Sequence, residues 1–122
     1  MDKMKISWQE SVSESNYEAA QSYLTILFNE ECVADLVQRL REAKITKFKS
    51  KDIFRASQLS LLGISNARVE KDRKKIENGI ALSPILLVRD PAHGKVVIAD
   101  GYHRMCAIYG LDENEWIQCK II

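Results

Sequence analysis

The first 80 residues carry apolar side chains at helical spacing. The clearest example has the i, i+3, i+4, i+7 spacing of one buried helix face: Val33, Leu36, Val37 and Leu40. An earlier helix is expected to begin at Ser15 or Asn16, both good N-cap residues, and to run through residue 28. Its apolar face is expected to contain Ala19, Ala20, Tyr23, Leu24 and Leu27. Two amphipathic helices are therefore predicted within residues 16–42.

Two further helices and a short strand are predicted before residue 80. The lysine-rich stretch KITKFKSKD breaks the helical period, and a strand is expected over residues 45–48. The next helix, capped by Ser50, is expected to bury Ile53, Phe54 and Leu59, and Gly63 is expected to end either this helix or the turn that follows LSLL. The fourth, capped by Asn66 and followed by Gly79, is expected to bury Val69 and Ile76. Its exposed face is strongly basic.

The last 40 residues change to strand patterns. The apolar run ILLVR, the turn DPAHG and the run KVVIA predict two buried strands joined by a tight connection. DGYHRMCAIYG predicts a short helix closed by Gly110, and the final segment alternates as a strand does, with Ile117, Cys119 and Ile121 on one side. This order predicts an α+β (mixed) fold with a small sheet. Residues 1–122 are expected to form a single domain, with about the first 50 residues as a helical extension packed on it.

The net charge of +1 hides three unequal blocks. Residues 1–35 hold two basic and seven acidic residues, and residues 76–122 hold four and six. Residues 36–75 between them hold twelve basic and four acidic residues. An anionic partner is therefore expected to bind near the middle of the sequence.

Several classes of protein are disfavoured by what the sequence lacks. No apolar run approaches the roughly 18 residues that a membrane-spanning helix needs, and the polar start does not resemble a secretion signal. A cytoplasmic location without membrane contact is expected. Three widely spaced cysteines argue against a disulfide framework. The two histidines are in no metal-binding spacing, so no metal site of the protein's own is predicted.

The junction IADGYHR has the parts of an anion site. A strand ends, Gly101 permits a close backbone approach, and a helix begins with His103 and Arg104 in its first turn. Free N–H groups at a helix N-terminus, together with a forked arginine, favour a phosphate. The alternative interpretation is ordinary: Asp100 caps the helix and Arg104 lies along its surface. Residues alone leave both interpretations open.

Three side chains of this junction have alternative roles. Capping is the favoured role for Asp100, although beside a nucleotide its carboxylate would hold Mg²⁺ or act as a catalytic base. His103 would bind phosphate or simply occupy a first helical turn. Tyr102 would stack on a base or pack against the fold.

Residues 69–122 resemble the ParB/sulfiredoxin superfamily. The resemblance rests on a PILLVR strand, a second strand and a G-x-[RH]-R-x-x-A box that is complete from Gly101 to Ala107. It implies nucleotide binding, since ParB proteins bind CTP, sulfiredoxins bind ATP, and a related free-serine kinase shares the fold. By position, Gly101, His103 and Arg104 would contact the phosphates of ATP or CTP, with Mg²⁺. Arg68 and Lys71 of the basic helix, and also Lys75, would face the same phosphates. The alternative is that Lys71, Arg73, Lys74 and Lys75 form a solvated helix face.

The sequence departs from these relatives at informative positions. Sulfiredoxin chemistry needs a thiolate before the histidine of the box, and this chain has Tyr102 there, so sulfinic acid reductase activity is not expected. Cys106 is expected to turn toward the core as a small hydrophobic residue. The separate helix-turn-helix domain of a complete partition protein is absent from these 122 residues. A nuclease role lacks support, because Asp100 is the one plausible metal ligand near the box.

Three functions remain as hypotheses. The first is a nucleotide-binding protein of the ParB/sulfiredoxin type, acting as a phosphotransferase or nucleotide hydrolase if it turns over. The second is a non-catalytic adaptor whose N-terminal helices bind a protein partner or a second copy of the chain. The third, nucleic-acid binding through the basic block, is weaker, because no stacking pattern of aromatic and basic residues accompanies the charge. Phe48 and Phe54 are expected in the core.

Overall fold

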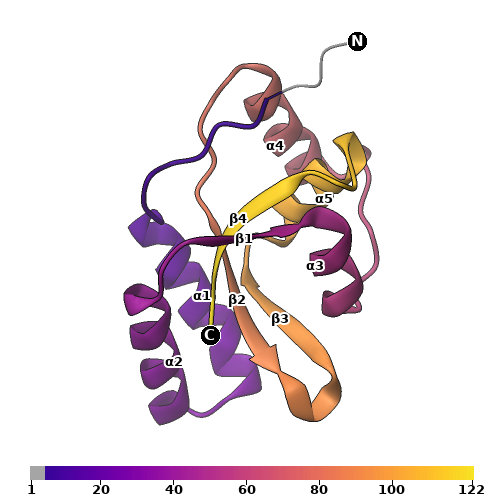
Figure 1. Cartoon of the computed structure of the whole chain (residues 1–122). Coiled ribbons are helices and arrows are strands. Elements are labelled where there is room, and N and C mark those ends of the chain that lie inside the picture. The colour runs from indigo at the N-terminus through magenta and orange to yellow at the C-terminus, as the bar shows by residue number, and fades with distance from the viewer. Residues whose placement is uncertain (1–4) are drawn as a thin grey trace.

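A computed structural model describes residues 5–122, which form five α-helices, four strands and one 3₁₀ turn (Figure 1). None of the helices in this range has the length and apolar character needed to cross a membrane. In chain order the elements are α1 (Glu14–Leu27), α2 (Glu30–Glu42), β1 (Thr46–Lys49), α3 (Ser50–Ser57), α4 (Ala67–Glu77), β2 (Ile85–Asp90), η1 (Pro91–His93), β3 (Lys95–Asp100), α5 (Tyr102–Leu111) and β4 (Trp116–Ile121).

The four strands form one mixed sheet in the order β1-β4-β2-β3. β1 pairs antiparallel with β4, and β2 pairs antiparallel with β3. β2 and β4 are parallel, with Ile85 opposite Cys119 and Leu87 opposite Ile121. The expected α+β (mixed) fold is confirmed, and the strand expected over residues 45–48 lies one residue later.

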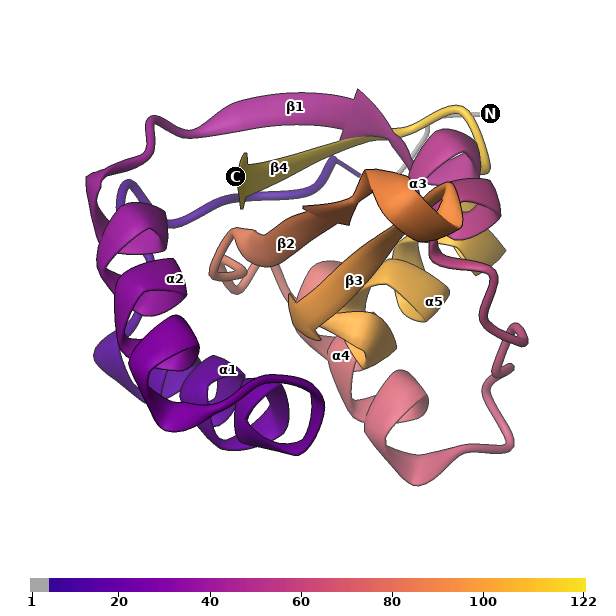
Figure 2. The same cartoon turned by 90° about the horizontal axis from the view of Figure 1, so that it is seen from below.

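Helices cover both faces of the sheet (Figure 2). Successive residues of β2 point to opposite faces: Leu86 and Val88 pack with α1 and α2, whereas Ile85 and Leu87 pack with α3, α4 and α5. Because a strand covered on both sides has no solvated face, β2 is an uninterrupted apolar run instead of an alternating one. The N-terminal helices therefore cover one face of the sheet, which accounts for the apolar face of α2 and for the buried residues of α1. Tyr23, Ile26 and Leu27 of α1 remain exposed.

The buried face of α1 differs from the one expected. Tyr17, Ala20 and Leu24 are buried, while Ala19, Tyr23 and Leu27 are exposed. The helix begins at Glu14 after the N-cap Ser13, earlier than predicted. Apolar residues of α1 lie on more than one side of the helix, so its sequence pattern alone does not indicate which side packs on the sheet. The α2 face, by contrast, is buried as predicted.

Three helix termini, two in α3 and one in α5, were also wrongly predicted. Ser50 is not the cap of α3 but its first residue, after the N-cap Lys49. The helix ends at Ser57 because Gln58 adopts a left-handed conformation (φ 57°), which leaves Leu59 outside it and exposed. Gly110 does not close α5, which continues to Leu111. The fourth helix is as predicted, since the Asn66 side chain accepts hydrogen bonds from the backbone N–H groups of its first turn.

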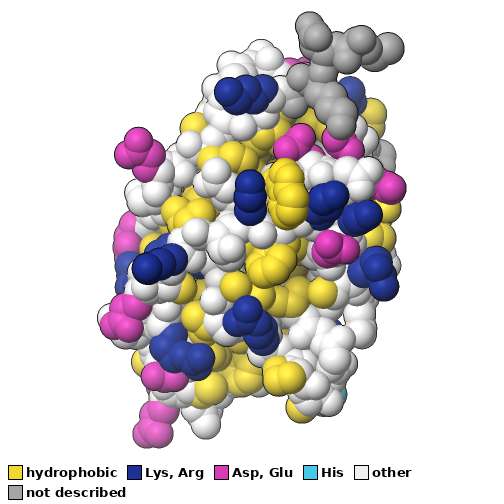
Figure 3. Space-filling model, viewed as in Figure 1, with side chains coloured by type: hydrophobic (Ala, Val, Ile, Leu, Met, Phe, Trp, Pro, Cys, Tyr) yellow, Lys and Arg dark blue, Asp and Glu magenta, His cyan; other side chains and the backbone are white. Residues whose placement is uncertain are grey.

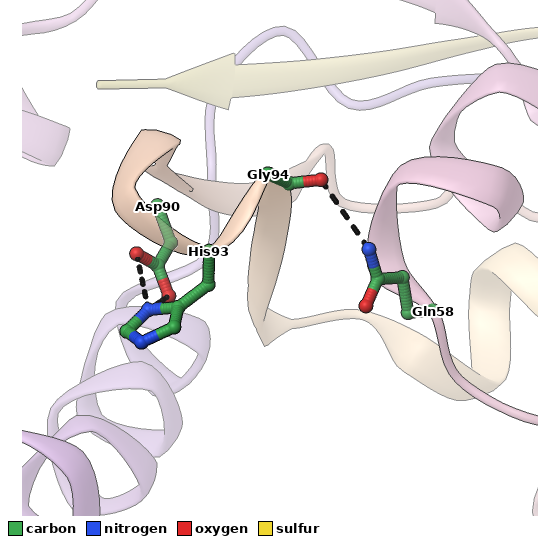
Figure 4. A network of polar contacts seen from close by, with 4 residues as sticks. All are labelled: Gln58, Asp90, His93 and Gly94. Carbon is green, nitrogen blue, oxygen red and sulfur yellow. Dashed lines mark hydrogen bonds and ion pairs between the residues drawn. The ribbon is translucent and has the colours of Figure 1, made fainter.

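Figure 4 shows polar contacts that fix the turn between β2 and β3. His93 Nδ1 lies 3.0 Å from both carboxylate oxygens of Asp90. Gln58 Nε2, at the end of α3, donates to the Gly94 carbonyl at 3.3 Å. His93 is thus part of a hairpin turn and belongs to a different element from His103.

The basic residues of α2 and β1 have partners within the chain. Arg41 forms an ion pair with Glu14 at 2.5 Å, and its guanidinium lies 4.4 Å from the centre of the Tyr17 ring. The ammonium groups of Lys47 and Lys49 lie 5.0 and 5.4 Å from the Trp116 ring. On the face shown in Figure 3, basic, acidic and apolar side chains are interspersed instead of forming a uniform basic surface.

Candidate functional site

The turn from β3 into α5 requires a glycine. Gly101 has a φ of +114°, which side-chain-bearing residues rarely adopt. A Cβ there would also lie 2.3 Å from Ile85 Cγ2 and 2.6 Å from Ile85 Cβ. The backbone of Gly101 therefore packs directly on β2, and this contact sets where α5 begins.

The N-terminus of α5 is not capped by Asp100, contrary to the interpretation favoured from the sequence. The N-cap residue is Gly101, and within residues 5–122 no side chain accepts a hydrogen bond from the first turn. The Asp100 carboxylate instead accepts a hydrogen bond from Arg104 Nη2 at 2.9 Å. The N–H groups at the positive end of this helix are therefore left for another acceptor.

A pocket of about 220 Å³ lies between α4 and the β3–α5 turn. It is called the cationic pocket, and its lining residues are Arg68, Lys71, Asp72, Lys75, Asp100, Gly101, His103 and Arg104. All seven residues expected to contact or act on phosphates, Lys75 and Asp100 included, line it, although they come from two segments about 30 residues apart. Packing of α4 against α5 brings these segments together.

The charges around the cationic pocket favour an anion. Four lining side chains are cationic and two are carboxylates. One carboxylate, Asp100, is neutralised by its ion pair with Arg104. Within residues 5–122, no acidic side chain forms an ion pair with Arg68, Lys71 or Lys75. These three positive charges are therefore available to a ligand.

Arg104 is held in a fixed position. Its side chain is 14% exposed, and the bond to Asp100 uses only Nη2. Its Nε is buried and has no hydrogen-bond acceptor within residues 5–122. The guanidinium therefore contains one buried donor that is unsatisfied within these residues, and such a donor is costly.

The surroundings of His103 favour its neutral form. Burial, reinforced by the positive charge of Arg68, lowers the pKa of His103 below its ordinary value, and Asp72 partly opposes the shift. A neutral imidazole still donates one hydrogen bond. A bound dianion would favour the protonated form.

Tyr102 and Cys106 do not line the cationic pocket. The Tyr102 hydroxyl donates to the Ser60 carbonyl, and its ring lies 5.3 Å from that of His103. Cys106 is 1% exposed, as expected for a core residue. Burial raises the pKa of the Cys106 thiol, so a reactive thiolate is disfavoured at this position.

The sequence interpretation missed Asp72 in the pocket lining. Residues 68, 71, 72 and 75 have the i, i+3, i+4, i+7 spacing of one helix face. Applying this spacing to the polar face of the fourth helix would have added Asp72 and strengthened Lys75. Within residues 5–122 no group of three or more His, Cys, Asp or Glu side chains is arranged to hold a metal ion.

No protein-family profile matches the chain, and neither a curated protein nor a solved structure is significantly similar to it.

Proposed function

We propose that this protein binds the phosphates of a nucleotide in the cationic pocket, as a domain of the ParB/sulfiredoxin type. The observation that carries the proposal is the convergence of Arg68, Lys71 and Arg104 on the uncapped N-terminus of α5. Cations and helix N–H groups are the two donors that phosphate sites combine. The turn is formed by the GYHRMCA box, whose resemblance to the ParB/sulfiredoxin superfamily also supports the proposal.

Each part of the pocket has a distinct role in this proposal. The absence of a side chain at Gly101 lets the turn pack directly on Ile85, which sets where α5 and its backbone N–H groups begin. Arg104 donates from its guanidinium to a phosphate oxygen while Asp100 accepts a hydrogen bond from Nη2 of the same group. Arg68 and Lys71 add charge from α4 on the opposite wall.

Magnesium fits this pocket only together with the nucleotide. Asp72 and Asp100 are the two carboxylates in the lining, fewer than a protein needs to hold the ion alone. Mg²⁺ is commonly bound by one or two carboxylates plus substrate phosphates. Asp100 Oδ1, which is not used by Arg104, is the atom that would contact the ion or accept a proton during phosphoryl transfer or hydrolysis.

Ligand-dependent stability tests the proposal. ATP, CTP and tripolyphosphate, with and without Mg²⁺, are expected to raise the unfolding temperature. A ligand at 100 times its Kd stabilises by about 2.7 kcal/mol. The Lys71→Glu variant should bind these ligands about tenfold or more weakly, because it reverses a charge in the pocket lining. A tenfold loss of affinity corresponds to about 1.4 kcal/mol.

A matched control lies on the same helix. Lys74 is exposed on α4 and does not line the cationic pocket, so Lys74→Glu makes the same charge change outside it. Calorimetric titration of both variants compares the loss of ligand affinity caused by a charge change in the pocket with the loss caused by the same change elsewhere on α4. Equal losses in the two variants, or no stabilisation of the wild type at millimolar ligand, would count against the proposal.

Phosphate affinity should also depend on pH through His103. Its pKa is lowered in the free protein, and a bound dianion raises it, so binding takes up a proton. Affinity is therefore expected to increase as pH falls from 8 to 6, by up to about tenfold per pH unit. The His103→Gln variant, titrated with the same ligand, corrects for protonation of the ligand itself. Parallel pH profiles for the two proteins would exclude His103 from the site.

A further inference from the structure

A second cavity adjoins the cationic pocket. Its volume is about 400 Å³, and it is called the aromatic cavity, lined by Ala19, Tyr23, Leu59, Arg68, Ile98, Ala99, Asp100, Gly101, Tyr102 and His103. Arg68, Asp100, Gly101 and His103 line both spaces. A ligand held at these shared residues would therefore extend from one space into the other.

The walls of the aromatic cavity are mostly apolar and come from distant parts of the chain. α1 contributes Ala19 and Tyr23, the segment between α3 and α4 contributes Leu59, and α5 contributes Tyr102. Figure 2 shows β3 ending and α5 beginning between α1 on one side and α4 on the other. The N-terminal helix thus forms one wall of a space whose opposite wall contains the GYHR turn.

Tyr23 and Leu59 line this cavity without being needed by the core. They are 43% and 41% exposed, whereas α1 packs on the sheet through Tyr17, Ala20 and Leu24. The Tyr102 hydroxyl is already bonded to the Ser60 carbonyl, which leaves its ring as the part available to a ligand. Away from the residues that it shares with the cationic pocket, the cavity therefore offers mainly aromatic and aliphatic surface.

We infer that the aromatic cavity binds the base and sugar of the nucleotide whose phosphates occupy the cationic pocket, an inference that rests on the proposed function. Its volume falls within the range of about 300–1,000 Å³ that small-molecule sites have. Tyrosine rings supply stacking surface for a base, and such stacking tolerates any base because each has a π-face. Tyr23 makes α1 part of the binding site.

Comparing ATP and CTP with tripolyphosphate isolates the nucleoside end. In calorimetric titrations with Mg²⁺, both nucleotides are expected to bind wild-type protein at least about tenfold more tightly than tripolyphosphate, as a buried, stacked base implies. Tyr23→Ala should remove most of this difference, and Ala19→Trp, which fills the cavity, should do the same. Neither substitution should change tripolyphosphate affinity, because neither residue lines the cationic pocket.

A control substitution and the contrary outcomes complete the experiment. Ile26 is 79% exposed on the same helix and does not line the cavity, so Ile26→Ala should leave every affinity unchanged. If tripolyphosphate binds as tightly as the nucleotides, or if Tyr23→Ala behaves like Ile26→Ala, the inference is wrong while the phosphate site stands. If neither the nucleotides nor tripolyphosphate bind, the proposed function fails and the inference fails with it.

Discussion

The Gly101→Ala variant is expected to lose about 3 kcal/mol or more of folding stability, combining backbone strain and overpacking of roughly 1–3 kcal/mol each. The strain arises because φ is +114° at this position. The overpacking arises because the new Cβ would lie 2.3 Å from Ile85 Cγ2, and Ile85 is fully buried in the core. Relief would require β2 and α5 to separate. Urea-induced unfolding without ligand measures the loss.

Two other glycines separate the strain from the steric clash. Gly79 also has a positive φ (+70°), but an added Cβ would meet nothing within 4 Å. Gly79→Ala should therefore cost only about 1 kcal/mol, the strain contribution alone. Gly63 has open space and no positive φ, so Gly63→Ala should be close to neutral. A Gly101→Ala loss no larger than that of Gly79→Ala would show that the contact with Ile85 relaxes easily.

Sequence patterns predicted those elements whose signals are local. Asn66 caps α4 with its own side chain, and α2 has a single apolar stripe, so both were predictable. The buried face of α1 was not, because which apolar side meets the sheet depends on Leu86 and Val88 of distant β2. Because the side of α1 that packs on the sheet was not predictable, the position of Tyr23 in the lining of a cavity was not predictable either.

The candidate site was predictable in part for the same reason. Gly101, His103 and Arg104 form one local motif, and helical spacing places Arg68 beside Lys71. The role of Asp100 was not predictable, because capping and pairing with Arg104 four residues later are both local possibilities. In the structure Gly101 is the N-cap residue, and Asp100 pairs with Arg104 instead of capping the helix. Asp72 was missed although the spacing of α4 would have indicated it.

The structure shows how the basic residues behind the net charge of +1 are distributed between partners within the chain and the cationic pocket. The basic residues Arg41, Lys47 and Lys49 are engaged by Glu14 or by aromatic rings of the chain. The later part of the basic block, from Arg68 to Lys75, contributes the free cations of the pocket. The anion site therefore draws its charge from one end of the basic block and from Arg104 in a formally acidic segment.

Removing the Arg104 guanidinium should have the largest effect on binding. In Arg104→Ala, a ligand phosphate loses a charge-assisted hydrogen bond, worth about 1.5–3 kcal/mol. It also meets the Asp100 carboxylate, which no longer has its partner at 2.9 Å. We expect affinity for ATP or tripolyphosphate to fall by about 100-fold or more, equivalent to about 2.7 kcal/mol. Arg104→Lys should recover only part of this loss. A lysine ammonium group lacks the planar, forked donors with which a guanidinium binds Asp100 and a phosphate at the same time.

The double variant Asp100→Asn/Arg104→Ala distinguishes the two causes. If repulsion by the unpaired Asp100 carboxylate contributes to the loss, neutralising this carboxylate should raise the affinity again by about tenfold, which corresponds to about 1.4 kcal/mol. If Arg104 acts only as a donor, the double variant should bind as weakly as the single one. Unfolding of each variant without ligand establishes that the fold is retained, since Asp100 and Arg104 are both largely buried. Undiminished binding in folded Arg104→Ala would exclude this arginine from the site and, with it, the phosphate-binding role assigned to the GYHR turn.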